Sequence, residues 1–99
     1  MTGRPANARL AARVDANQAE IVSALKQIVG SDNVFNLKEP VDLMVAYGGR
    51  NILMEVKGEK GKLTPKQDIF FNNWQGQVDI VRNVQDAIDV INKATKRRR

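Results

Sequence analysis

The sequence predicts a compact α/β domain in which helices flank a mixed central sheet, with elements in the order α-β-β-β-α-β-α. Three observations favour this class: apolar residues recur at helical spacing near both ends, two strand-like runs flank a glycine pair, and a Thr-Pro step opens a helix between them. The chain has 99 residues, which is the length of one small domain. Because such a domain buries a limited core, dimerisation or a bound ligand would add to its stability.

The first helix is expected over residues 15–29, where Asp15 is a candidate N-cap and Gly30 a plausible end. Gln18 lies on the apolar stripe of this helix and is therefore expected to face inward. A short strand is expected over residues 33–37. The apolar positions that define the helix are Ile21, Val22, Leu25, Ile28 and Val29.

Residues 41–57 predict a β-hairpin, because two strand-like runs flank Gly48 and Gly49, a pair suited to the positive φ angles of a tight turn. With these glycines at the centre of the turn, the numbers of cross-strand partners sum to 97, as in Tyr47 opposite Arg50. One face of the hairpin is then wholly apolar and is expected to build the core: Val41, Leu43, Val45, Ile52, Met54 and Val56.

The second half of the chain predicts a helix that begins at Thr64-Pro65, with Thr64 as N-cap, and ends at Gly76. A strand is expected within residues 77–82 and an amphipathic helix over residues 84–93, through Val84, Ala87, Ile88 and Ile91. The aromatic stripe of the first of these helices is expected in the core rather than stacked on nucleic-acid bases: Phe70, Phe71 and Trp74.

The composition excludes several kinds of site. Without cysteine there are no disulfides or thiolate metal sites, and without histidine the commonest metal ligand and general base is missing. A metal would have to be held by oxygen, which favours Mg²⁺ or Mn²⁺ over zinc. No apolar run is long enough for a membrane span and the start lacks the apolar core of a signal peptide, so a cytoplasmic location is expected.

Positive charge is concentrated at the two ends of the chain. Residues 1–13 carry three arginines and no acid, residues 96–99 are all basic, and the residues between hold nine basic and eleven acidic side chains. We therefore divide the chain into a basic N-terminal arm (1–13), a single domain (14–93) and a basic C-terminal tail (94–99). Such ends either bind nucleic-acid phosphates or only keep the protein soluble, and charge alone does not separate these interpretations. The candidate phosphate contacts at the ends are Arg4, Arg9, Arg13, Lys96, Arg97, Arg98 and Arg99.

A candidate active site follows from the hairpin register, which places Asp42 directly opposite Glu55 on the face away from the core. Lys57 shares that face because it lies two residues beyond Glu55. Two carboxylates this close need a cation or a proton to offset their charge, and a hard divalent ion would do so. A plain ion pair on a solvated strand is the simpler interpretation of Glu-x-Lys alone, but the matching Asp42 favours a site.

Asp42, followed by Glu55-Val56-Lys57 and by the helix opening Leu63-Thr-Pro-Lys-Gln67, resembles the PD-(D/E)xK nuclease superfamily. More narrowly the chain is similar to the VRR-NUC type, especially its small stand-alone members from phages and prophages. The similar segments run in order through residues 13–91: 14–22, 42–45, 49–51, 55–58, 63–65 and 75–78. The chain departs from the pattern at the Pro-Asp step, since Val41 stands between Pro40 and Asp42.

The resemblance implies a restriction-endonuclease-like core and Mg²⁺- or Mn²⁺-dependent hydrolysis of DNA phosphodiesters. The substrate it implies is branched DNA such as a four-way junction, cut by a homodimer in the bacterial host cytoplasm if the protein is phage-encoded. It assigns the metal to Asp42, Glu55 and the backbone carbonyl of Val56, and catalysis to Lys57. Two alternatives to a nuclease remain: a catalytically silent DNA-binding protein with the same fold, and an interaction domain with basic tails. Gln67 fits an active-site role and a capping box equally well. Candidate contributors on the first helix are Asp15, Gln18 and Glu20. Candidate DNA contacts are Lys60, Lys62 and Lys66.

Overall fold

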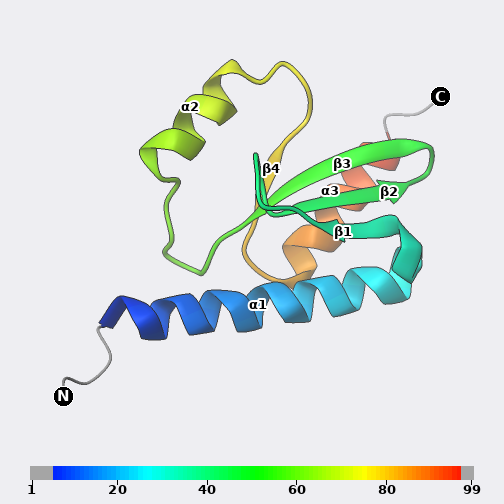
Figure 1. Ribbon diagram of the computed structural model, residues 1–99. Coiled ribbons are helices and arrows are strands. Elements are labelled where there is room, and N and C mark those ends of the chain that lie inside the picture. Colours follow the sequence, from blue (N-terminus) through cyan, green and yellow to red (C-terminus); the bar gives the residue numbers. More distant parts are fainter. Residues whose placement is uncertain (1–5, 97–99) are drawn as a thin grey trace.

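A computed structural model describes the backbone of residues 6–96 and the side chains of residues 16–95. The chain forms α1 (Ala6–Val29), a 3-10 turn η1 (Ser31–Asn33), β1 (Val34–Asn36), β2 (Leu43–Tyr47), β3 (Arg50–Val56), α2 (Pro65–Asn73), β4 (Asp79–Val81) and α3 (Val84–Lys96). The predicted α/β class and element order are confirmed, and Figure 1 shows α1 and α3 near the sheet with α2 set apart from both.

The four strands form one mixed sheet in the order β1-β2-β3-β4. β1, β2 and β3 are antiparallel neighbours, whereas β4 runs parallel to β3. The hairpin register is the predicted one, since Tyr47 pairs with Arg50 and Leu43 with Met54. Gly48 and Gly49 have φ angles of 60° and 75°, as a two-residue turn of this kind requires.

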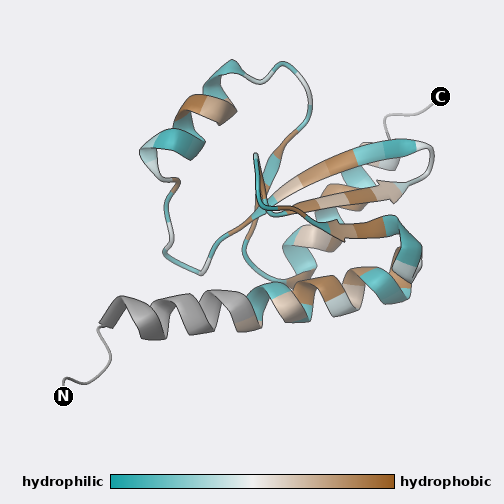
Figure 2. Cartoon of the chain, viewed as in Figure 1, coloured by the Kyte–Doolittle hydropathy of each residue, from teal (hydrophilic) through white to brown (hydrophobic). Residues whose placement is uncertain are grey.

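The core lies between one face of the sheet and the helices α1 and α3. All six residues of the predicted apolar face of the hairpin are at most 2% exposed. The brown segments of Figure 2 show the same concentration of hydrophobic residues in the strands and in the facing parts of α1 and α3. The helices and outer strands contribute Ile21, Val22, Leu25, Val34, Val81, Ala87, Val90 and Ile91.

Both terminal helices are longer than the sequence predicted. α1 begins at Ala6, so Asp15 lies inside the helix and is not its N-cap, and the arm–domain boundary at residue 13 is not a helix boundary. The alanines and arginines of residues 6–13 are strong helix formers, which explains the extension. α3 likewise continues to Lys96. Ile28, at the edge of the α1 stripe, is 44% exposed and does not join the core as expected.

The expectation that the α2 aromatic stripe is core is wrong. α2 ends at Asn73 and buries none of its residues, and Trp74, its C-cap, is 46% exposed. The core lies between the sheet and the helices α1 and α3, and the aromatic rings of α2 pack on one another outside it. Trp74 stacks on Phe70 with ring centroids 5.3 Å apart, and Phe70 meets Phe71 edge to face.

Candidate active site

Asp42 lies immediately before β2, at the end of the sheet where the hairpin strands leave their ladder. Its backbone carbonyl accepts a hydrogen bond from the Leu37 N–H at 2.7 Å. Its Oδ2 accepts one from the Val56 N–H at 2.8 Å. The last paired residues of the ladder are Leu43 and Met54. Just beyond them, the Asp42 carboxylate replaces a backbone carbonyl as the acceptor for the Val56 N–H.

Glu55 is the buried charged side chain among the described residues, with 2% of its surface exposed. Burial raises the pKa of the Glu55 carboxyl from its ordinary 4.5 to about 7, and the charge and hydrogen bonding of Asp42 act in the same direction. Lys57 opposes both effects. The carboxyl groups of Asp42 and Glu55 are thus close enough to interact, but the ladder ends one pair earlier, at Leu43 and Met54, so the predicted Asp42–Glu55 pairing is not part of it. Two carboxyl groups this close are candidates for binding a cation.

Lys57 follows the end of β3 and extends its ammonium group back toward Glu55. Its Nζ lies 3.5 Å from Glu55 Oε2 and donates to Gln67 Oε1 at 2.7 Å. The backbone is held as firmly, because the Lys57 N–H donates to the Val81 carbonyl at 3.0 Å and so prolongs the β3–β4 ladder. The lysine is only 15% exposed in its side chain, which points to a fixed rather than a freely solvated cation.

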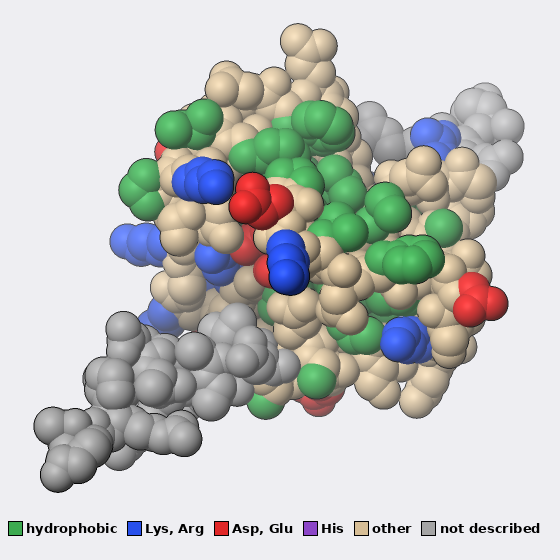
Figure 3. Space-filling view, viewed as in Figure 1, with side chains coloured by type: hydrophobic (Ala, Val, Ile, Leu, Met, Phe, Trp, Pro, Cys, Tyr) green, Lys and Arg blue, Asp and Glu red, His purple; other side chains and the backbone are tan. Residues whose placement is uncertain are grey.

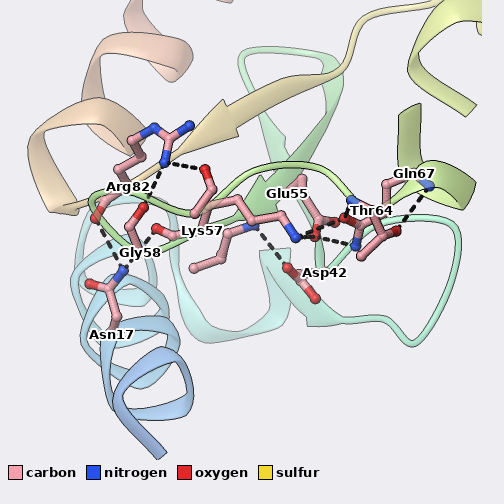
Figure 4. A network of polar contacts seen from close by, with 10 residues as sticks. Asn17, Asp42, Glu55, Lys57, Gly58, Thr64, Gln67 and Arg82 are labelled. Carbon is pink, nitrogen blue, oxygen red and sulfur yellow. Dashed lines mark hydrogen bonds and ion pairs between the residues drawn. The ribbon is translucent and has the colours of Figure 1, made fainter. Parts of the chain in front are cut away.

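Gln67 forms the predicted capping box and also contacts Glu55 and Lys57, while its active-site role stays a prediction. In the capping box of α2, its N–H donates to Thr64 Oγ1 at 3.2 Å and its Oε1 accepts from the Thr64 N–H at 2.9 Å. The same side chain bridges the catalytic candidates, because Nε2 donates to Glu55 Oε2 at 2.8 Å while Oε1 also accepts from Lys57. Figure 4 shows Gln67 and Thr64 meeting Glu55 and the Lys57 ammonium on one side of the network.

The oxygen atoms at this end of the sheet suit a hard divalent cation. A strand residue directs its N–H and C=O to the same side, so the Val56 carbonyl faces the side on which its N–H meets Asp42. Asp42, Glu55 and this carbonyl then offer an all-oxygen donor set of the kind that Mg²⁺ and Mn²⁺ accept alongside water. Within residues 16–95, no cluster of three or more acidic residues forms a fuller metal cage.

The helix α1 contributes to the site through a residue that the sequence did not single out. Asn17 Nδ2 donates to the Lys57 carbonyl at 3.3 Å and to the Arg82 carbonyl at 3.1 Å. Gln18 is half-buried as expected, but its Nε2 donates to Asn36 Oδ1 at 3.0 Å, on β1. Glu20 is exposed, and the side chain of Asp15 lies outside the described residues.

Arg82 is the second residue that sequence reasoning missed. Its Nη1 donates to the carbonyls of Gly58, Gly61 and Glu59 at 2.6, 2.8 and 3.3 Å. The contact joins the end of β4 to the loop after Lys57, across more than twenty residues of sequence. A weak signal existed for Asn17, because asparagine is a poor residue for a helix interior, but none pointed to Arg82.

The basic candidates fall into two groups. Lys60 and Lys62 are exposed on the loop that follows Lys57, and Lys66 is exposed at the start of α2, with Nζ 3.5 Å from Glu39 Oε1. All three lysines are exposed and so can meet solvent or a ligand, but their contact with DNA stays a prediction. The side chains of the terminal candidates lie outside the described residues: Arg4, Arg9, Arg13, Lys96, Arg97, Arg98 and Arg99.

Comparison of the chain with protein-family models, with characterised proteins and with solved structures gives no match. None of the helices within residues 6–96 is both long enough and apolar enough to cross a membrane. The chemistry of the site itself is therefore the basis for inferring a function.

Proposed function

We propose that the protein is a metal-dependent endonuclease that hydrolyses DNA phosphodiesters at the site of Asp42, Glu55 and Lys57. The observation that carries this proposal is the buried Glu55 carboxyl, whose pKa is raised to about 7 beside Asp42 while the Lys57 ammonium is held 3.5 Å away. Two neighbouring carboxylates repel each other unless a positive charge lies near them. An ion pair that only stabilises a fold usually joins one acid and one base, whereas two acids meet one lysine here. Perturbed groups that converge in this way are typical of functional sites.

Asp42, Glu55 and the Val56 carbonyl would hold a Mg²⁺ or Mn²⁺ ion. A bound ion of this type supplies Lewis acidity at the phosphoryl oxygen and lowers the pKa of a bound water. The protein's part is to deliver two anionic ligands in fixed positions. Asp42 is fixed by the Val56 N–H and Glu55 by Gln67, so little reorganisation is needed when a cation arrives.

Lys57 acts toward the phosphate and the attacking water rather than as a ligand. Its ammonium can donate hydrogen bonds and offset negative charge that develops on the phosphoryl oxygens. Gln67 orients Lys57 through the 2.7 Å hydrogen bond and links it to the carboxylate whose charge it balances. The reaction then proceeds by direct attack of water, without a covalent enzyme intermediate.

The proposed substrate is branched DNA such as a four-way junction, selected by shape and phosphate positions. The proposed active form is a homodimer, which presents two sites to a twofold-symmetric junction. An exposed apolar surface supports dimerisation. The sheet face opposite the core exposes Phe35 and Met44, at 54% and 37%, and Figure 3 shows hydrophobic side chains gathered across this side of the molecule. Exposed apolar patches of this kind mark interaction surfaces.

The test is cleavage of supercoiled plasmid, linear duplex and a four-way junction by the purified protein, with Mg²⁺, with Mn²⁺ and with a chelator. Metal-dependent cutting, fastest on the junction, is the expected result. Binding without cutting in both metals would favour a catalytically silent DNA-binding protein. No binding at all would leave only an interaction domain with basic ends.

A further inference from the structure

The loop after Lys57 contains a tight turn that is tied to the rest of the protein by one side chain. The Gly61 N–H donates to the Gly58 carbonyl at 3.1 Å, which closes the turn Gly58–Gly61. Arg82 Nη1 donates to the carbonyls at both ends of this turn, at 2.6 and 2.8 Å, and also reaches the Glu59 carbonyl. The two N–H groups of one guanidinium nitrogen thus meet the carbonyls of Gly58 and Gly61, and the longer contact with Glu59 shares one of them.

Lys57 itself has separate anchors. Its N–H donates to the Val81 carbonyl, its carbonyl accepts from Asn17, and its ammonium donates to Gln67. Figure 4 shows this division, with the Arg82 and Gly58 contacts on one side of Lys57 and the carboxylates and Gln67 on the other. Removal of the Arg82 hydrogen bonds would free the turn while leaving the catalytic lysine in place.

The turn carries charged groups beside the site. Lys60 is exposed at its tip, Lys62 is exposed directly after it, and the intervening Gly61 lies close against Lys57, where an added Cβ would be 3.4 Å from the Lys57 Cβ. Glu59, also at the tip, is the acidic neighbour of these lysines. Flexible lysines bind phosphate more strongly when the backbone that carries them is already ordered, because less entropy is lost on binding.

We propose that Arg82 is a positioning residue for DNA affinity: by holding the turn Gly58–Gly61 it presents Lys60 and Lys62 to backbone phosphates beside the scissile bond. The inference rests on the proposed nuclease function and extends it to a residue whose guanidinium contacts the backbone of the turn. Under this proposal, the residues around Lys57 divide between catalysis and DNA binding. Gln67 orients the Lys57 ammonium for the chemistry, and Arg82 orders the turn that binds the substrate.

The variant Arg82→Met keeps the length of the side chain and removes its hydrogen bonds. It should raise KM for the four-way junction about three- to tenfold, the cost of ordering one or two lysine side chains on binding, and change kcat less than twofold. Arg50→Met is the matched control, because it removes the same charge from an exposed position at the opposite end of β3. Arg82→Lys, which can still donate to the carbonyls, should recover part of the affinity.

The decisive measurement is a double-mutant cycle on junction affinity in the inactive Asp42→Asn protein. Lys60→Ala should weaken binding in the Arg82-containing protein and have a smaller effect in the Arg82→Met protein, since the free turn no longer presents the lysine. Equal effects in both backgrounds, or a fall in kcat without a change in KM, would overturn the proposal. If Arg82→Met fails to fold, unchanged binding after Lys60→Ala and Lys62→Ala together would overturn it instead. Wild-type protein that cuts no DNA in either metal would reject the nuclease function, a result distinct from all of these.

Discussion

At the scale of single residues, Gln67 combines a structural and a functional role in one side chain. Its amide caps α2 through Thr64 and at the same time connects Lys57 with Glu55. The two roles share the Gln67 side chain, but only one of them needs the hydroxyl of Thr64. This difference allows them to be separated by mutation.

Thr64→Ala removes the hydroxyl that caps α2 and should lower the free energy of unfolding by about 1 kcal/mol, with cleavage retained. Gln67→Ala keeps the Thr64 hydroxyl bond but removes the side-chain bridge between Lys57 and Glu55, and it should reduce kcat about ten- to a hundredfold because Lys57 loses its orienting partner. Chemical denaturation and single-turnover cleavage measure the two effects. Equal activity of the two variants would show that Gln67 is only a cap.

Glu55 makes the stability of the metal-free protein depend on pH. Its folded-state pKa of about 7 lies above the ordinary 4.5, so between these values the folded chain holds a proton that the unfolded chain has released. The contribution of Glu55 to stability is therefore present below about pH 4.5 and lost as pH rises to about 7, by up to about 3 kcal/mol. Glu55→Gln lacks this titration and is the control.

The measurement is urea denaturation of both proteins in chelator from pH 4.5 to 7.5. The difference in unfolding free energy, wild type minus variant, should fall steadily across the range. A constant difference would mean that the Glu55 carboxyl is not perturbed. Added Mg²⁺ should reduce the pH dependence of the wild type, since the ion favours the ionised carboxylate.

At the scale of elements, the β2–β3 hairpin was the part of the fold best predicted from the sequence. The glycine pair determined the turn, the turn determined the register, and the register brought Asp42 and Glu55 together. Local patterns carried all three steps. Asp42 itself lies just outside the ladder, and its side chain accepts a hydrogen bond from the Val56 N–H. Strand-pairing rules describe backbone partners and do not predict such a side-chain contact.

The α2 aromatic residues were mispredicted because a helical stripe does not say which surface it meets. Phe70 and Trp74 stack on each other outside the core, which the sheet forms with α1 and α3 instead. Asn17 and Arg82 were missed for a related reason: each acts on backbone carbonyls far away in sequence. Contacts of this kind depend on tertiary structure and leave no periodic signal.

Gly48 tests the hairpin turn. Gly48→Ala should lower the unfolding free energy by at least about 1–2 kcal/mol, because alanine is disfavoured at a φ of 60° and its Cβ would lie 2.8 Å from Thr95 Cγ2. In a Thr95→Ser background, which removes that methyl group, the same substitution should cost less. Thermal denaturation of the four proteins measures this coupling. Identical costs in both backgrounds would show that the tip of the hairpin does not touch α3.

At the scale of the whole molecule, charge is divided between a slightly acidic body and two basic ends. If the ends hold DNA electrostatically, deletion of residues 96–99 should weaken binding similarly across sequences. The plot of log affinity against log salt concentration should also become less steep. The slope should change by up to about 0.9 for each phosphate contact that a protomer loses. Anisotropy titrations of the Asp42→Asn protein, full-length and truncated, at several salt concentrations test this. An unchanged slope would favour the solubility interpretation.

Junction cleavage by wild type, Asp42→Asn and Glu55→Gln in Mg²⁺ or Mn²⁺ tests whether Asp42 and Glu55 form the metal site of a nuclease. Each substitution removes an anionic ligand with almost no change in size, so both variants should fold and bind DNA. We expect metal-dependent cutting by the wild type and none by either variant. Near wild-type cutting by either variant would show that the replaced carboxylate is not a required metal ligand.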